Sequence, residues 1–298
     1  MLEFPLFYPW RTRRYNEAMR LSIVIPALNE ADHIIAMLAP LQAMRARGVE
    51  VILVDGGSTD TTRQLAASLV DRVIDSERGR AKQMNAGANA ARGEALLFLH
   101  ADSTVPPDAD QLILRSLQST SRAWGRFDVS ITGQHFFLPV VAWCMNLRSR
   151  LTGIATGDQG LFMTADAFTA ADRFANIPLM EDVAICAVLK KISPPLCLKQ
   201  KIITSGRRWE KHGVWRTIFL MWRIRLAYFL GADPVALHHT YHAAEEKLSR
   251  HAVRKSTGSG RGEDTAHPGA RRGACRTITR APDGARAGDA HQSRCRAG

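Results

Sequence analysis

The stretch VILVDGGSTD, residues 51–60, decides how the fold is read. Its first four residues are branched and apolar, which is typical of a strand buried on both faces of a helix-covered parallel sheet. Asp55 and two glycines follow, so a carboxylate and a tight turn come at the end of that strand. In open α/β sheets, ligands bind beyond the carboxyl ends of the strands. On its own, the stretch fits equally well a plain loop in which Ser58 or Thr59 caps the next helix.

Working outward, strands alternate with helices through the first hundred residues. Apolar runs predict strands at 21–26, 51–54, 72–75 and 94–99, with helices at 29–47, about 60–69 and 82–92. This alternation predicts βαβ units and a Rossmann-like, mostly parallel α/β sheet flanked by helices. The region lacks GxGxxG and GxxxxGK[ST], which excludes the usual dinucleotide and P-loop phosphate sites. Beyond residue 104 the pattern is mixed, with an antiparallel strand predicted at 124–132.

Charge and composition divide the chain into three parts. The net charge is +12, and half of it lies in 243–298, where ten Arg and two Lys face six acidic residues. This basic tail has few large apolar residues, so we expect it to be disordered and not to bind nucleic acid. Residues 1–20 are interpreted as a poorly ordered extension. Between them, 21–242 is predicted to be one folded domain, with the regular strand–helix alternation at 21–103 and the mixed pattern at 104–242.

Five cysteines without a CxxC pair predict a reducing, cytoplasmic environment. No stretch of about 18 uninterrupted apolar residues is present, so a transmembrane helix is not expected. Residues 214–230 are apolar and aromatic but are interrupted by Arg216, Arg223 and Arg225. They predict either a helix packed on the core or a helix lying on the inner face of the cell membrane, with arginines at the lipid head groups.

Two predicted strands end in carboxylates, Asp55 and Asp102, and in a parallel sheet both point to the same edge. One carboxylate can accept hydrogen bonds from a nucleoside, and the other can hold Mn²⁺ or Mg²⁺, which often uses one or two carboxylates plus substrate phosphates. Asp60 is better explained as a carboxylate at a helix start. Asp158 either caps a turn or contacts an acceptor.

Three motifs in this order resemble family 2 glycosyltransferases of the GT-A fold: IVIPALNE at 23–30, VDGGSTD at 54–60 and LFLHAD at 97–102. The resemblance covers about residues 21–240, and it implies that 21–242 is a catalytic domain with a nucleotide-binding half at 21–103 and an acceptor half at 104–242. GRAKQMNAGA at 79–88, GDQG at 157–160, ED at 181–182 and RRW at 207–209 are similar to a subgroup labelled as associated with arsenosugar biosynthesis. The family usually has DxD where this chain has His100-Ala101-Asp102, which leaves His100 as a second candidate metal ligand beside Asp102.

The resemblance implies a role for each matching residue. Asp182 would be the general base that deprotonates the acceptor hydroxyl, and Asp102 would hold the divalent metal. The implied nucleotide-sugar-binding residues are Pro26, Ala27, Glu30, Asp55, Arg80, Lys82, Asp102, Arg207, Arg208 and Trp209.

The resemblance therefore implies a metal-dependent, inverting transfer of a sugar from a UDP or GDP donor to the hydroxyl of a small-molecule or lipid-linked acceptor. Two alternatives remain. A nucleotidyltransferase also uses a Rossmann-like sheet and metal carboxylates, although its glycine-rich, lysine-containing loop is missing where this chain reads PALNE. A non-catalytic protein that binds nucleotide sugars or membrane surfaces is the other.

Overall fold

The computed structural model describes residues 19–244, apart from the side chains of Arg208 and His212. The extension predicted for 1–20 and the tail predicted for 243–298 lie outside the described residues, except for two residues at each boundary. Of these, Met19 is buried in the core, and the backbone N–H of Arg20 donates to Glu94. The first described residues are therefore already part of the packed domain.

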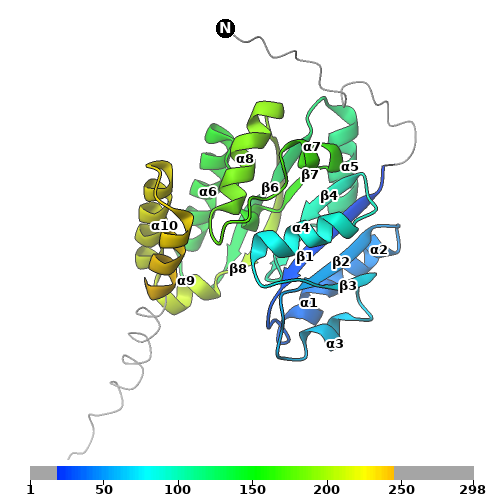
Figure 1. The fold of residues 1–298 in the computed structure, drawn as a ribbon, viewed down its shortest axis with the longest axis horizontal. Helices are drawn as coiled ribbons and strands as arrows, with labels where there is room; N and C mark the ends of the chain where they lie inside the picture. Colours follow the sequence, from blue (N-terminus) through cyan, green and yellow to red (C-terminus); the bar gives the residue numbers. More distant parts are fainter. Residues whose placement is uncertain (1–18, 245–298) are drawn as a thin grey trace, which may run out of the picture. The chain divides into compact units, whose positions relative to one another are not determined.

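The strands of residues 19–244 form a single sheet (Figure 1). Their bounds are β1 Leu21–Ala27, β2 Glu50–Asp55, β3 Arg72–Asp75, β4 Ala95–Phe98, β5 Ser103–Thr104, β6 Trp124–Thr132, β7 Leu161–Thr164 and β8 Leu196–Ser205. Their order across the sheet is β3-β2-β1-β4-β7-β6-β8-β5.

The sheet is mostly parallel, as predicted. β1 runs parallel to β2 and β4, and β2 runs parallel to β3. β7 is antiparallel to both β4 and β6, while β6 and β8 pair in parallel and β5 closes the sheet antiparallel to β8. β6 has the predicted bounds, and it is antiparallel to β7 but parallel to β8.

Helices flank the sheet. Their bounds are α1 Ile34–Leu38, α2 Gln42–Arg45, α3 Thr62–Ala66, α4 Arg80–Ala90, α5 Ala109–Ser119, α6 Leu138–Thr152, α7 Ala165–Ala170, α8 Glu181–Ile192, α9 Arg207–His212 and α10 Val214–Phe229, with 3₁₀ turns η2 Ala39–Leu41 and η3 Gly157–Gln159. A further helical segment runs from 234 to 244.

The helix predicted at 29–47 is wrong in its start and its continuity. Asn29 has a φ of 54°, a left-handed conformation, and regular helix begins only at Ile34. Pro40 lies in η2, between α1 and α2. Proline lacks the N–H that would continue the α-helical hydrogen bonds, so the chain bends there. The residues after β1 that were expected in a helix are instead a loop at the edge of the sheet.

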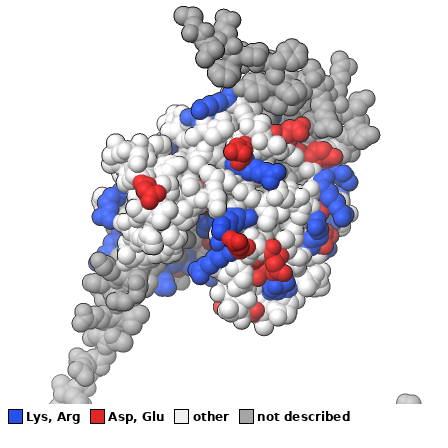
Figure 2. Space-filling view, in the orientation of Figure 1, with Lys and Arg blue, Asp and Glu red and all other residues white. Residues whose placement is uncertain are grey.

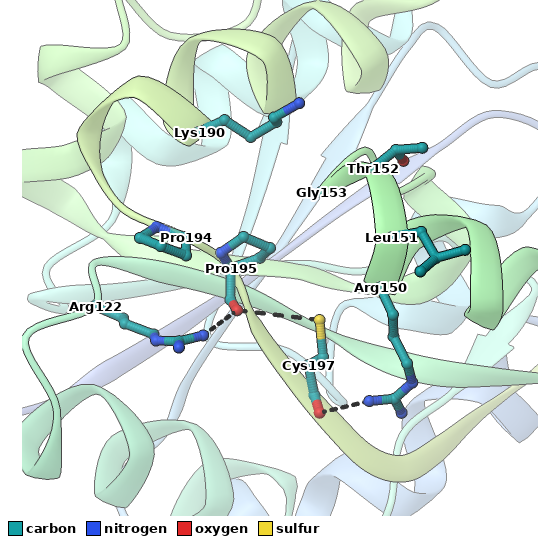
Figure 3. A pocket seen from close by; sticks show the side chains of 9 residues that line it. All are labelled: Arg122, Arg150, Leu151, Thr152, Gly153, Lys190, Pro194, Pro195 and Cys197. Carbon is teal, nitrogen blue, oxygen red and sulfur yellow. Dashed lines mark hydrogen bonds between the residues drawn. The ribbon is translucent and has the colours of Figure 1, made fainter.

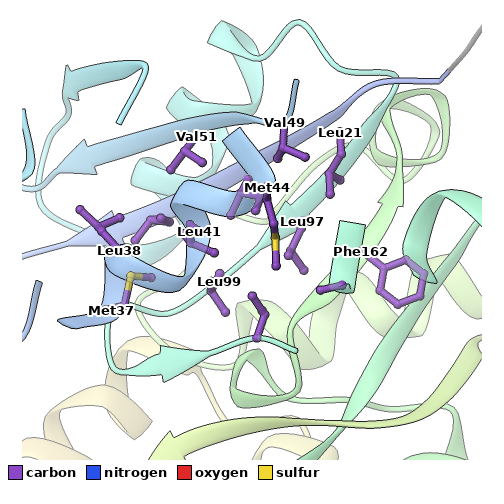
Figure 4. Packing of buried hydrophobic residues seen from close by; sticks show 14 of the residues in the cluster. Leu21, Met37, Leu38, Leu41, Met44, Val49, Val51, Leu97, Leu99 and Phe162 are labelled. Atoms are coloured by element: carbon purple, nitrogen blue, oxygen red, sulfur yellow. The ribbon is translucent and has the colours of Figure 1, made fainter. Parts of the chain in front are cut away.

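Both faces of the central strands are buried, which explains their unbroken apolar runs. Leu21 of β1 and Val51 of β2 pack with Leu38 and Met44 of α1 and α2 on one face (Figure 4). On the opposite face, side chains such as Val54 pack against α4. α4 lies directly on the sheet, because a Cβ added at its Gly87 would come 2.8 Å from Val54 Cγ2.

Candidate active site

The carboxyl ends of β1 and β2 lie side by side, because Ala27 is paired with Asp55. Asp55 is buried, and its Oδ2 accepts hydrogen bonds from the backbone N–H groups of Gly57 (3.1 Å) and Ser58 (2.9 Å). The Ser58 hydroxyl donates to Oδ1. The carboxylate therefore holds its own loop in place, and a ligand could use only the lone pairs that these three bonds leave.

Ser58 does not cap the following helix. α3 begins at Thr62, and the side chain of the residue before it, Thr61, makes no capping hydrogen bond. The Ser58 hydroxyl oxygen instead accepts a hydrogen bond from the backbone N–H of Asn29 (2.9 Å). The prediction that Ser58 or Thr59 caps this helix is therefore wrong. Ser58 joins the loops that follow β1 and β2.

Asp60 joins the same two loops. Its Oδ2 accepts from the backbone N–H of Ala31 (3.1 Å), and its Oδ1 accepts from that of Thr62 (3.0 Å). The hydrogen bond from the Thr62 hydroxyl is the main reason why the pKa of Asp60 lies below its ordinary value. Thr62 Oγ1 also accepts from the backbone N–H of Glu30 (2.8 Å). Asp60 thus supports the loop that carries Glu30, and it lies just before α3 rather than in its first turn.

A buried amide, Gln83 of α4, fills the space beside Gly56. A Cβ on Gly56 would lie 2.9 Å from Gln83 Cδ and Nε2. Nε2 donates to the carbonyl oxygens of Ala27 and Val54, both at 2.9 Å. Gln83 thus ties α4 to the ends of β1 and β2. The only signal of this role in the sequence is a long polar side chain within the alanine-rich segment of α4.

Glu30, Asp102 and Arg207 meet at the same edge of the sheet. Arg207 Nη2 lies 3.9 Å from Glu30 Oε2. The carboxylate of Asp102 accepts from the Ser103 hydroxyl (3.2 Å), and the Asp102 carbonyl oxygen accepts from the backbone N–H of Ser205 (3.2 Å). Burial raises the pKa of Glu30, Arg207 opposes this shift and Asp102 adds to it. Three separate segments of the chain thus bring their charges within electrostatic reach of one another.

Arg80 lies among four carboxylates at the start of α4. Its Nη1 is 3.6 Å from Glu181 Oε1, and its side chain is about half exposed. Burial lowers the pKa of Arg80, but Glu181, Asp158, Asp182 and Asp102 outweigh it and raise the pKa above its ordinary value. Figure 2 shows the mixture of basic and acidic side chains in this region, between α4 and α10. The predicted donor-side Arg80 and base Asp182 therefore belong to one charged cluster.

Asp182 is held at the N-terminal end of α8. Its Oδ2 accepts from the backbone N–H of Gly157 (2.9 Å), and its Oδ1 accepts from that of Val183 (2.7 Å). Its neighbour Glu181 is buried, and burial, with Asp182 adding to it, raises the pKa of Glu181. The two adjacent carboxylates thus have different environments, and Asp182 is the one whose orientation is fixed by backbone N–H groups.

His100 contacts protein groups on both sides of its ring. Nδ1 lies 3.2 Å from Asp158 Oδ1, and the Nε2 side lies against Gly157. The pairing with His100 is one of the contacts of Asp158 and belongs to neither of the two roles proposed for it from sequence. Within the described residues, no three His, Cys, Asp or Glu side chains come together as a metal site. A metal here would depend on Asp102 and on the ligand's own oxygens.

Lys82 and Trp209 contact the protein rather than open space. Lys82 Nζ forms an ion pair with Glu77 (2.6 Å) on the surface. Trp209, on α9, packs against the cluster formed by β6, α6 and the start of α10. Arg208 lies between Arg207 and Trp209 on the same short helix. These contacts give Lys82 and Trp209 structural partners in addition to any contact with a ligand.

A separate cavity lies at the opposite edge of the sheet, near the starts of β6 and β8 (Figure 3). It has a volume of about 670 Å³, and three basic side chains line it, those of Arg122, Arg150 and Lys190. Arg122 donates to the carbonyl oxygen of Pro195, and Arg150 donates to that of Cys197. Because this cavity is far along the strands from Asp102 and both arginines are engaged, it is not part of the candidate site.

The comparison that decides the family concerns residues 22–177, which match the model of glycosyl transferase family 2. The chain belongs to this family. The matched region contains β1 to β4 and the loops that carry Glu30, Asp55 and Asp102. The family member described here thus has its charged cluster at the edge of the sheet where the matched strands end.

Individual family members are similar over part of their length. The chain is 39% identical over 93 residues to the succinoglycan biosynthesis protein ExoO of Rhizobium meliloti, covering 30% of this chain and 27% of that protein. It is 39% identical over 95 residues to a PGL/p-HBAD biosynthesis glycosyltransferase of Mycobacterium bovis, covering 30% and 37%. The match to each of these curated relatives thus spans only about a third of the relative's length.

Solved structures share the fold. The mannosyltransferase PcManGT of Pyrobaculum calidifontis aligns with a TM-score of 0.53 at 19% identity, over 87% of this chain and 84% of that one. TarS 1-349 of S. aureus aligns with a TM-score of 0.52 at 18% identity, over 78% and 74%. These likenesses confirm the predicted GT-A fold class.

Proposed function

We propose that this protein transfers a glycosyl group from a nucleoside-diphosphate sugar to an acceptor hydroxyl. The observation that carries the proposal is the meeting of Asp102, Glu30 and Arg207 with the Arg80–Asp182 cluster at the ends of β1, β2 and β4. A diphosphate needs cationic groups around it, and an acceptor hydroxyl needs a carboxylate that can take its proton. The cluster supplies both within one site.

The donor would lie across the ends of β1 and β2. Loops from these strands would border the nucleoside through Pro26, Ala27, Glu30 and Asp55. The diphosphate would face the basic residues Arg80, Arg207 and Arg208, with Trp209 beside the leaving group. Lys82 would contribute through long-range charge, because it is paired with Glu77. Neighbours that contain UDP-GlcNAc, or GDP-Man with Mn²⁺, support testing both donor types.

A divalent metal, Mn²⁺ or Mg²⁺, would be held by Asp102. Such ions often use one or two carboxylates and take their other oxygens from substrate phosphates and water. Asp102 fits this pattern because its side chain is partly exposed beside Arg207 and Glu30. The metal would neutralise charge on the leaving diphosphate. His100 as a second ligand stays a prediction, and its ring would first have to leave Asp158.

Asp182 would act as the general base. The backbone N–H groups that bind its two oxygens orient the carboxylate. It would accept the proton of the acceptor hydroxyl while that oxygen attacks the anomeric carbon from the side opposite the diphosphate, which inverts the anomeric configuration. Arg80 and Arg207 would stabilise the negative charge that develops on the leaving group.

The experiment that tests this proposal is a binding panel read by thermal shift. UDP, GDP, ADP, CMP and inorganic diphosphate are compared with and without Mn²⁺. We expect UDP or GDP to raise the midpoint of unfolding, with a larger rise when Mn²⁺ is present, and Asp102→Ala to lose the Mn²⁺-dependent part. Turnover of nucleoside triphosphates would instead favour a nucleotidyltransferase. Nucleotide binding without transfer to any of a broad range of acceptors would favour a non-catalytic binding protein.

The acceptor class remains a proposal. The subgroup likeness to proteins associated with arsenosugar biosynthesis rests on residues of α4, η3, α8 and α9, and it makes a small polar acceptor worth testing. A lipid-linked acceptor is the second candidate, and a specific surface favours it.

That surface is an apolar face formed by α6 and α10. Its large exposed side chains comprise Val140, Trp143, Leu147 and Leu151 along α6, Phe136 in the turn before α6, and Trp215, Phe219, Trp222, Leu226 and Phe229 along α10. Neither helix contains an acidic residue, while Arg216 and Arg223 are exposed beside the face. An anionic lipid surface would match this combination, whereas a second copy would bring arginines together without carboxylates.

Within residues 19–244, no helix is long and apolar enough to cross a bilayer. The test is co-sedimentation of the full chain with phosphatidylglycerol vesicles and with neutral phosphatidylcholine vesicles. We expect binding to the anionic vesicles that weakens at least tenfold in Trp222→Ser. Lipid docking would be contradicted if wild type and Trp222→Ser were found in the pellet in equal amounts in the absence of vesicles. It would also be contradicted by concentration-dependent dimerisation that Trp222→Ser abolishes.

A further inference from the structure

Two arginines on neighbouring helices have buried nitrogen atoms without hydrogen-bond partners. In Arg148 of α6 these atoms are Nε and Nη2, and in Arg225 of α10 the atom is Nε. Neither guanidinium forms a hydrogen bond or an ion pair with a described residue, although both lie within electrostatic reach of Asp182 and Asp158. Buried charged donors are normally paired, because burial removes the water that would otherwise solvate them.

The two positive charges also disfavour each other. Burial, and then the charge of Arg225, lower the pKa of Arg148 to about 10. Burial likewise lowers the pKa of Arg225. Of the two alternatives for residues 214–230, the membrane-surface helix would place all three arginines at lipid head groups. Arg216 and Arg223 are exposed, whereas Arg225 is half-buried and lies within electrostatic reach of Asp182 and Asp158, as on a helix that is packed on the core. An anion bound between two such cations would offset their mutual repulsion and would accept charge-assisted hydrogen bonds from them.

We propose that Arg148 and Arg225 form an anion-binding subsite for the acceptor, which takes a phosphate or carboxylate group of the acceptor molecule next to Asp182. The inference rests on the proposed glycosyl transfer and names the class of acceptor. The donor's diphosphate is a less suitable occupant of this subsite, because two other arginines would already bind it. These are Arg80, which lies beside Glu181, and Arg207, which lies beside Glu30. The guanidinium nitrogens that are not buried would meet the anion, since both side chains are only partly covered.

Tyr228 lies one turn after Arg225 on α10, on the same side of the helix. Its side chain is half-buried, and burial together with the negative charge of Asp182 raises its pKa. It therefore keeps its proton at neutral pH and can donate a hydrogen bond to an anion. Two cations and one neutral donor beside the proposed base would fix the anionic end of an acceptor, and would thereby set the position of its hydroxyl.

The first test is thermal unfolding of the full chain with UDP and Mn²⁺ at saturation, so that phosphate cannot report on the donor site. Inorganic phosphate is titrated against wild type, Arg148→Met, Arg225→Met and the control Arg115→Met, which removes an exposed arginine of α5. We expect both subsite variants to unfold at a higher temperature than wild type without phosphate, because an unpaired buried charge is gone. We also expect phosphate to stabilise wild type and the control, but not the subsite variants.

The second test is calorimetric titration with glycerol 1-phosphate and with glycerol on the UDP-bound protein. Glycerol 1-phosphate should bind wild type, and each subsite variant should weaken it about 10- to 100-fold, the range for a hydrogen bond to a charged group. Co-sedimentation with phosphatidylglycerol vesicles distinguishes a lipid head group from a free phosphate. If the subsite binds a lipid head group, Arg148→Met should bind the vesicles less tightly than wild type; if it binds only free phosphate compounds, both proteins should bind the vesicles equally.

The inference is overturned if the subsite variants unfold at a lower temperature than wild type and keep its phosphate response, or if glycerol 1-phosphate binds no more tightly than glycerol. The affinity of each protein for UDP is recorded in the same experiments. Loss of UDP binding by wild type itself would count against the proposed function, whereas normal UDP binding without an effect of phosphate would count against the anion subsite alone.

Discussion

Gly157 connects His100 and Asp182, so Gly157→Ala should damage activity far more than stability. Its backbone N–H donates to Asp182 Oδ2 at 2.9 Å, and a Cβ at this position would overlap the His100 ring atoms Nε2 and Cε1, within the 3.0 Å below which a neighbour must move. Either the imidazole rotates away from Asp158, 3.2 Å from its Nδ1, or the 157–159 turn shifts and displaces the hydrogen bond to Asp182.

The two costs differ in size. Losing one hydrogen bond of a partly exposed pair costs about 1 kcal/mol, which lowers the midpoint of unfolding by about 2–4 °C for a domain of roughly 150–250 residues. A displacement of about 1 Å at a catalytic group costs about 100-fold in rate. We therefore expect a small change in melting temperature and a fall of about two orders of magnitude in the rate of nucleotide release in the presence of acceptor.

A double-mutant cycle with His100→Ala gives the control. Removing the imidazole makes room for the new methyl group, so the variant with both changes should be no less stable and no slower than His100→Ala alone. The reasoning would be refuted if Gly157→Ala turned over within twofold of wild type, or if the effects of the two changes on rate and stability simply added.

Two further predictions concern stability. The pKa of Glu181 is raised, chiefly because the side chain is buried. Its contribution to the stability of the fold is therefore fully present below its ordinary pKa of 4.5 and is lost as the pH rises through its pKa in the folded protein. Glu181→Gln, which cannot ionise, should therefore unfold at a higher temperature than wild type at pH 8 and lose this advantage near pH 4; an unchanged difference across that range in fluorescence-monitored melting would contradict it. Gly206→Ala would place a Cβ onto the backbone carbonyl of Thr132, with the carbonyl carbon at 3.1 Å, and should cost about 3 kcal/mol in urea unfolding, since backbone cannot rotate away. Wild-type stability in that variant would show that β6 and α9 are less tightly joined than described.

The central sheet could be predicted from sequence because its strands carry their own signal. β1, β2, β3 and β4 lie within a residue or two of the predicted positions. Their residues alternate between two buried faces, which leaves unbroken apolar runs that few other structures would need. The insertion of β7 between β4 and β6 could not be predicted, because it depends on pairing between residues far apart in the chain.

The site was predicted in part for the same reason. The residues at strand ends, Asp55 and Asp102, follow from the strands, but the direction of each side chain does not. Asp55 turns into its own loop, where the backbone N–H groups of Gly57 and Ser58 donate hydrogen bonds to its carboxylate. Asn29, Asp60 and Thr62 form hydrogen bonds that join the loop after β1 to the loop after β2. Contacts of this kind leave no periodic pattern in the sequence.

Arg225 shows the limit most clearly. In sequence it is one of three arginines that interrupt an apolar helix, and all three have the same local context. The structure exposes Arg216 and Arg223, whereas Arg225 is partly buried and lies within electrostatic reach of Asp182. Helical spacing places Arg225 on a different face of the helix from Arg216 and Arg223. It does not predict which of the two faces lies toward the candidate active site.

The central claim, that sugar transfer occurs at the edge of the sheet where Asp102 and Asp182 lie, is tested most directly by turnover. Nucleotide release from UDP- and GDP-sugars is measured with Mn²⁺ and with acceptors of the phosphate-bearing class, for wild type, Asp102→Ala and Asp182→Asn. We predict that one donor type supports release in wild type, that each variant loses at least about 100-fold of the rate, as expected for an essential acid–base or metal-binding group, and that Asp182→Asn still binds the nucleotide. Unchanged turnover in both variants would contradict the account.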